Sequence, residues 1–144
     1  MAATDTLTTL TTTVFDSVEG YRQAMTKAQS PALKTALQER LTKREQTLAT
    51  LNAGLDRLGA ARVMKGSVTG DLHRRWLGIA DMFENGDEAA AERVEEGEDY
   101  LLKKFEEASR ETGLDPQVRT VIEQCLPEIR EGEQFGDMIE KQYD

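Results

Sequence analysis

Two charged residues interrupt otherwise apolar helical repeats, and this pattern constrains the fold more than any other feature of the chain. Arg44 stands at the gap of one series and Glu98 at the gap of another. The apolar residues of each series mostly lie three or four positions apart, and this spacing selects one face of an α-helix. Because Arg44 and Glu98 lie on these faces, both charges should face neighbouring helices. A buried charge is costly unless it is paired, so each should have a partner inside the protein. The two series are Leu37, Leu41, Leu48, Leu51, Leu55 and Leu58, and Ala91, Val94, Leu101, Phe105 and Ala108.

Capping residues, prolines and glycines divide the chain into four long helices. Ser30-Pro31 and Asp115-Pro116 each place a capping side chain before a proline at the first helical position. Glycines stand where a left-handed residue would end a helix. The pattern predicts helices that begin near Thr4 or Asp5, at Pro31, after Asp87 as a capping residue, and at Pro116.

The connection between the second and third helices, residues 59–87, is far longer than a hairpin needs. A short amphipathic helix is expected within it, with Leu72, Trp76, Ile79 and Phe83 on one side. Such a connection can run the length of the bundle, which lets the second and third helices be parallel, as in ferritin-like bundles. The sequence therefore predicts an all-α, ferritin-like four-helix bundle with one long crossover, forming a single domain over residues 1–144.

Composition excludes several classes of function. The formal net charge is −9, with 18 basic residues against 27 acidic ones. This balance argues against nucleic-acid binding and against an anionic membrane surface, whereas a cationic or metal-ion partner stays compatible with it. No apolar run approaches the roughly 18 residues of a spanning helix. A single cysteine rules out an internal disulfide, which is compatible with a reducing compartment. Met1 to Thr13 has no basic leader region, so a cytoplasmic location is expected.

A polar layer is expected halfway along the bundle. If the second and third helices are parallel, Arg44 and Glu98 fall at about the same level. The first helix brings Asp16, Glu19 and Tyr21 to that height. Because a guanidinium can neutralise two carboxylates, we expect Arg44 to stand in for a cation. Glu98 would be its first partner, and Asp16 or Glu19 its second.

Two alternatives compete with this layer. One is a di-iron or di-manganese centre held by Glu19, Glu95, Glu98 and Glu128. Such centres in ferritin-like proteins use Glu-x-x-His motifs, and the only histidine, His73, lies on the crossover. In the other alternative, Arg44 extends its side chain to the surface. The favoured layer needs no cofactor.

The crossover carries a local basic and aromatic segment, His73-Arg74-Arg75-Trp76. It could form a surface that binds an acidic partner or an anion. Alternatively, the indole of Trp76 docks the crossover against the bundle.

These segments together resemble a family of bacterial ferritin-like four-helix-bundle proteins described as a domain of unknown function. The resemblance runs from about Leu7 to Ile139. It implies a ferritin-like fold and a bacterial, cytoplasmic origin, and it supplies no established activity. The residues that carry it are Glu19-Gly20-Tyr21-Arg22-Gln23-Ala24, Arg44, Leu58-Gly59, Gly66-Ser67, His73-Arg74-Arg75-Trp76 and Glu95-Glu96-Gly97-Glu98-Asp99.

The chain departs from that family at two places. Glu133 stands where relatives often have a histidine, and Thr50-Leu51 stands where they often have Glu-Leu. Both changes remove potential metal ligands. We therefore expect a non-catalytic soluble bundle that acts through protein–protein or self-association, with stress physiology as one setting. The alternative is a carboxylate-bridged di-metal protein for metal storage or oxidation.

Overall fold

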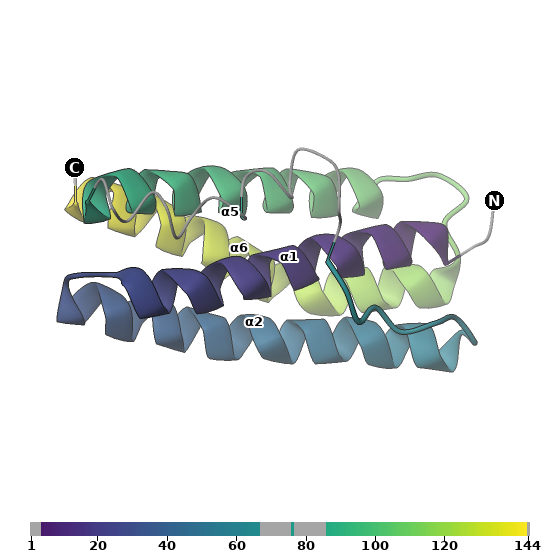
Figure 1. Cartoon of the computed structure of the whole chain (residues 1–144). Helices are drawn as coiled ribbons and strands as arrows, with labels where there is room; N and C mark the ends of the chain where they lie inside the picture. The colour runs from purple at the N-terminus through teal and green to yellow at the C-terminus, as the bar shows by residue number, and fades with distance from the viewer. Residues whose placement is uncertain (1–3, 67–75, 77–85, 144) are drawn as a thin grey trace.

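The protein is a bundle of four long α-helices (Figure 1). The structure, a computed structural model, describes residues 4–66, 76 and 86–143. The described residues form no strand, so the predicted all-α four-helix bundle is confirmed. The helices are α1 (Asp5–Lys27), α2 (Pro31–Arg57), α5 (Asp87–Ser109) and α6 (Pro116–Gln142).

The two helices that begin with proline are capped by side chains, as predicted. The Ser30 hydroxyl accepts a hydrogen bond from the Leu33 amide at 3.2 Å, and the Asp115 carboxylate accepts one from the Gln117 amide at 2.8 Å. Gly59, just after α2, has φ +75°, a backbone conformation that glycine adopts without strain. The side chains of Ser30 and Asp115 satisfy amide groups that the first turn of a helix leaves unpaired.

Asp87 does not cap α5 as predicted. It is the first residue of that helix, and Gly86 occupies the capping position. The Asp87 carboxylate instead accepts hydrogen bonds from the backbone amides of Gln29 and Ser30, at 3.0 and 2.8 Å. This contact ties the start of α5 to the turn between α1 and α2.

The hydrogen bonds of Asp87 to the turn between α1 and α2 give the relative directions of the helices. Because α5 begins beside the start of α2, the two helices run parallel, and α1 and α6 run in the opposite direction (Figure 1). The end of α2 and the start of α5 therefore lie at opposite ends of the bundle. The short helix predicted within this connection falls outside the described residues, except for Trp76.

Two hydrophobic clusters fill the bundle, one toward each end, and Arg44 lies between them along α2. Trp76, Tyr21 and the first apolar residues of α2 belong to one cluster. The other contains Phe105 and the apolar residues late in α2. Most predicted core positions are buried, although Leu48 and Leu58 are only partly so.

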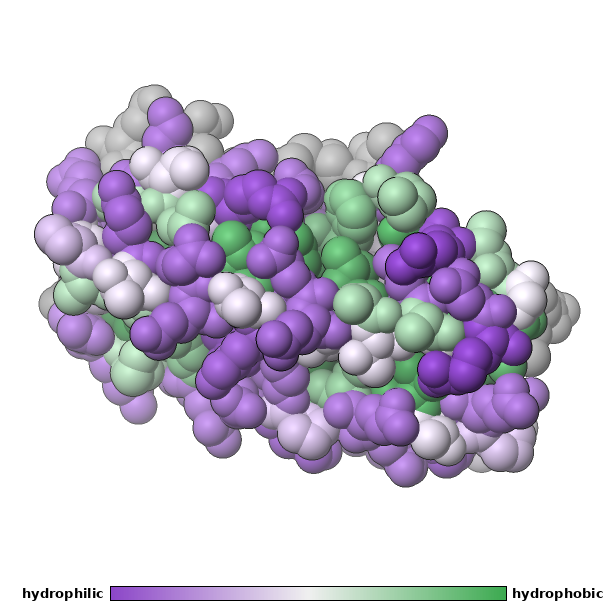
Figure 2. Space-filling view, turned by 90° about the horizontal axis from the view of Figure 1, so that it is seen from below, coloured by the Kyte–Doolittle hydropathy of each residue, from purple (hydrophilic) through white to green (hydrophobic). Residues whose placement is uncertain are grey.

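The outer surface is mainly hydrophilic on the face shown in Figure 2, with hydrophobic side chains visible between polar ones. Among the described residues, Met64 and Met138 are the large hydrophobic side chains that are well exposed. No described helix has the length and hydropathy needed to cross a lipid bilayer.

Candidate functional site

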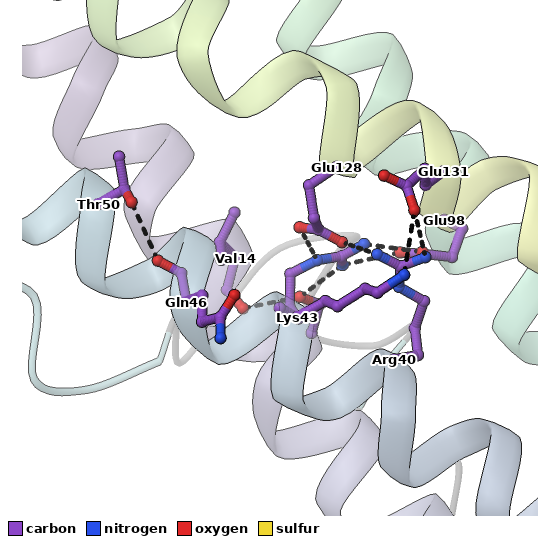
Figure 3. Close-up of polar contacts among 10 residues, drawn as sticks. Val14, Arg40, Lys43, Gln46, Thr50, Glu98, Glu128 and Glu131 are labelled. Carbon is purple, nitrogen blue, oxygen red and sulfur yellow. Dashed lines mark hydrogen bonds and ion pairs between the residues drawn. The ribbon is translucent and has the colours of Figure 1, made fainter.

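Arg44 lies at the centre of a buried polar layer. Its side chain, from α2, is completely buried, and Glu98 of α5 is 1% exposed. The two guanidinium nitrogens Nη1 and Nη2 donate to the two carboxylate oxygens of Glu98, each at 2.8 Å (Figure 3). Two parallel, charge-assisted hydrogen bonds of this kind fix both distance and orientation.

The remaining edges of the Arg44 guanidinium are also occupied. Nε donates to Oε1 of Glu128, from α6, at 2.9 Å, and Nη1 donates to the Ser17 hydroxyl, from α1, at 3.0 Å. Ser17 donates its own proton to the carbonyl of Val14 at 2.7 Å. Its lone pairs are therefore free to accept from Arg44. All four helices contribute to the layer.

A second arginine extends the layer toward the surface. Arg40 lies one turn before Arg44 on α2 and is also buried. Its Nη2 donates to Oε2 of Glu128 at 2.6 Å, so the Glu128 carboxylate bridges the two arginines. At the rim, Glu131 lies 3.3 Å from the Lys43 ammonium and is half-exposed (Figure 3). The layer thus runs from the core to the α2–α6 seam.

Gly132 of α6 makes room for the central ion pair. A Cβ atom at this position would overlap Oε2 of Glu98 and Nη2 of Arg44. Gly132 follows Glu128 by one helical turn, so both face the layer. The glycine is therefore required by the packing of the pair.

Two further glycines form a slot for Trp76. A Cβ at Gly97 of α5 would lie 2.7 Å from atoms of the indole ring, and one at Gly20 of α1 would also overlap it. The Trp76 ring packs on Tyr21, with 5.3 Å between the ring centroids. The Tyr21 ring in turn lies 5.7 Å from the Arg44 guanidinium carbon. The Tyr21 ring therefore lies between Trp76 and the Arg44 guanidinium and contacts both.

The layer shifts the proton affinities of its members. Burial alone would raise the pKa of Glu128, but the charge of Arg44 and its hydrogen bond outweigh this effect and lower that pKa. Burial alone would lower the pKa of Arg44, and the carboxylates of Glu98 and Glu128 raise it well above its usual value. Burial, and then the Glu98 charge, raise the pKa of Tyr21. At neutral pH, the raised pKa of Arg44 and the lowered pKa of Glu128 therefore keep both groups charged.

The predicted partners of Arg44 are only partly the observed ones. Glu98 is where the sequence places it. Glu19 is not in the layer, because its position on α1 faces outward, where its carboxylate pairs with Arg22 and is 40% exposed. Asp16 is buried, and its carboxylate lies against Gly66. Glu128, which the sequence places at the height of the layer but which is expected as a ligand only in the alternative metal centre, is the second carboxylate that binds Arg44.

The four glutamates named for the alternative di-metal centre do not lie together in the structure. Glu98 and Glu128 both bind the Arg44 guanidinium, and Glu19 points away. Glu95 instead lies with Asp137 and Glu140, on the α5–α6 seam, where one oxygen of each carboxylate lies within 4.8 Å of the others. The alternative in which Arg44 extends to solvent is also wrong, since its side chain is fully buried.

The predicted interaction surface on the crossover is contradicted at one of its four residues. Trp76 is only 1% exposed, because its indole fills the slot between Gly20 and Gly97. It cannot contribute to a surface in this conformation. The other three residues, His73, Arg74 and Arg75, lie outside the described residues.

Comparison with known proteins gives the family of the chain. A family model described as a domain of unknown function, DUF2383, matches residues 2–111, which is most of the sequence. The chain belongs to this family. The DUF2383 match includes α1, α2 and α5, with Ser17, Arg44 and Glu98, whereas α6 with Glu128 and Gly132 lies beyond it. No curated protein and no solved structure matches the chain.

Proposed function

We propose that this DUF2383 protein is a non-catalytic, ferritin-like bundle that acts by associating with protein, either a second copy or another chain. In this proposal residues 1–144 form one soluble, cytoplasmic domain. The Arg44 guanidinium takes the position that metal ions hold in carboxylate-bridged bundles. The observation that carries the proposal is that the hydrogen bonds of Arg44 end on protein acceptors from three other helices.

The chemistry of the layer favours a structural role over a catalytic one. A catalytic metal site needs ligands with free lone pairs and an open position for substrate. Here the Glu98 carboxylate is occupied by two hydrogen bonds from Arg44, and Glu128 is shared between two arginines. A permanent positive charge at the centre would also repel a metal ion. The layer is therefore suited to fixing the register of four helices.

The distribution of charge supports association through the surface. Residues 4–66 carry nine basic and six acidic side chains, whereas residues 86–143 carry seven basic and seventeen acidic ones. The α1–α2 hairpin itself, residues 5–57, is nearly neutral, with seven basic and six acidic side chains, so the negative charge is concentrated on the α5–α6 hairpin. A concentration of negative charge of this kind directs the orientation of a positively charged partner and makes binding sensitive to salt.

Metal analysis and light scattering test this proposal together. Protein is purified without chelator, loaded with Fe²⁺ or Mn²⁺, desalted and measured for metal content. We expect well below one metal ion per chain, and we expect a dimer, or a complex with a captured partner, that weakens as salt rises. One or two metal ions per chain that persist in a Glu95→Gln/Asp137→Asn/Glu140→Gln variant would contradict the proposal. A protein that stays monomeric and captures no partner would also contradict it.

A further inference from the structure

The space that the Arg44 guanidinium fills, called here the guanidinium cavity, has the geometry of a receptor for one class of cation. Its walls are Ser17 of α1, Glu98 of α5, and Glu128 and Gly132 of α6. We propose, building on the function proposed above, that this cavity is selective for a planar guanidinium ion over a spherical divalent cation. When the side chain of Arg44 is truncated, free guanidinium should therefore bind in its place.

The acceptors lie along the edges of a plane. Glu98 accepts from one edge of the guanidinium through two parallel bonds of 2.8 Å, and Glu128 accepts from the adjacent Nε edge at 2.9 Å. Ser17 adds an acceptor at 3.0 Å. These are N–H···O distances, and the arrangement matches a fork of donors. A divalent cation needs oxygen ligands that converge on one point at about 2.0–2.6 Å, which this arrangement does not provide.

The remaining wall is flat because Gly132 has no side chain. A Cβ atom built at Gly132 would overlap Nη2 of Arg44 and Oε2 of Glu98, so this wall has no space for a side chain. Such a wall accommodates the edge of a planar ion. It offers no oxygen or nitrogen side-chain ligand to a metal ion.

The cavity should keep its shape when Arg44 is truncated. Glu128 remains bound to Arg40 through a 2.6 Å ion pair, and Ser17 remains bound to the carbonyl of Val14. Glu98 is the group left with an uncompensated buried charge. A monovalent cation with two parallel donors would restore that charge balance.

Chemical rescue of the full-length Arg44→Ala variant tests this inference. Thermal unfolding is measured with 0–20 mM guanidinium chloride, a range in which its denaturing effect is small. We expect a saturating rise in Tm of about 2 °C or more for Arg44→Ala, and none for the wild type. Sodium chloride, magnesium chloride and manganese chloride at equal ionic strength serve as comparisons.

The Arg44→Ala/Glu98→Ala variant is the matched control, because it lacks the two parallel acceptors. It should show no saturating response to guanidinium. If Arg44→Ala is unfolded at 20 °C, the same titration is followed as a gain of helical circular dichroism.

Rescue by manganese or magnesium that equals or exceeds rescue by guanidinium would overturn the inference. A guanidinium response no larger than that of sodium chloride would also overturn it. Neither result bears on the metal content of the wild type, so failure here is distinct from failure of the proposed function.

Discussion

Glu98 and Arg44 meet edge to edge at the centre of the bundle, through two hydrogen bonds of 2.8 Å between side chains that are 1% and 0% exposed. The pair joins α5 to α2, which are far apart in sequence. Removing two charges from water costs several kcal/mol, so such a pair contributes little net stability compared with a well-packed apolar pair. It does make any other alignment of these helices costly, because a shifted register would leave both charges unpaired.

Replacing Arg44 alone should therefore be severe. We expect Arg44→Leu to lower the free energy of unfolding by about 3–5 kcal/mol, because Glu98 is left buried without a counter-charge. The double variant Arg44→Leu/Glu98→Leu should recover much of this loss. Urea denaturation followed by circular dichroism measures both. Single and double variants that are each as stable as the parent would show that the pair is not buried.

The lowered pKa of Glu128 predicts a specific pH dependence. A carboxyl group whose pKa is lower in the folded state stabilises the protein above its unfolded pKa, about 4.3, and this contribution is lost as pH falls through the folded pKa. At pH 7 we expect Glu128→Gln to cost about 1–3 kcal/mol, because its bonds to Arg44 and Arg40 lose one charge. The stability difference between wild type and variant should shrink below about pH 4. A difference that is constant from pH 7 to pH 3 would contradict this account.

Glu95 should show the opposite dependence. Its pKa is raised, first by burial and then by the charges of Glu140, Asp99 and Asp137. A carboxyl group with a raised pKa destabilises the folded state at neutral pH, and this cost disappears as pH falls toward the unfolded pKa. Glu95→Gln should therefore be more stable than the wild type at pH 7, with a gain that diminishes below about pH 5. Urea unfolding at a series of pH values measures this gain in stability. A Glu95→Gln variant that is less stable than the wild type at pH 7 would contradict the prediction.

The slot for Trp76 can be tested by fluorescence, since the chain has one tryptophan. An alanine at Gly97 would place its Cβ 2.7 Å from the indole ring, so the ring must move. We expect Gly97→Ala to shift Trp76 emission to longer wavelength and to cost about 1–3 kcal/mol through overpacking.

Glu92→Ala, at an exposed position of α5, is the matched control for the slot. It should change neither the Trp76 emission nor the stability by more than a few tenths of a kcal/mol. Unchanged emission in Gly97→Ala would mean that Trp76 does not occupy the slot.

The helices and the central pair could be predicted from the sequence because both depend on local pattern. Capping residues before Pro31 and Pro116 mark helix starts, and the three-and-four spacing identifies Arg44 and Glu98 as inward charges. Each of these signals depends on residues close together in the chain. The structure shows the corresponding helix starts and the buried pair.

The rest of the layer depends on how four helices rotate relative to one another, which local spacing does not specify. Arg40 directly precedes Leu41 in the sequence, and its charge alone would indicate an exposed position. The buried face of α2 is nevertheless wide enough to include both Arg40 and Leu41. Glu128 follows Pro127 in an acidic stretch, and only its contact with Arg40 and Arg44 makes it an internal residue. The glycine one turn later, Gly132, is the sequence feature from which a close approach at this level could have been predicted.

The most direct test of the central claim is a high-resolution crystal structure of the protein grown with Mn²⁺, with anomalous data collected to locate the metal. We predict electron density for the Arg44 guanidinium bonded to both oxygens of Glu98, with no anomalous peak among Ser17, Glu98 and Glu128. One or two anomalous peaks in that layer, with the Arg44 side chain displaced from Glu98, would contradict the account.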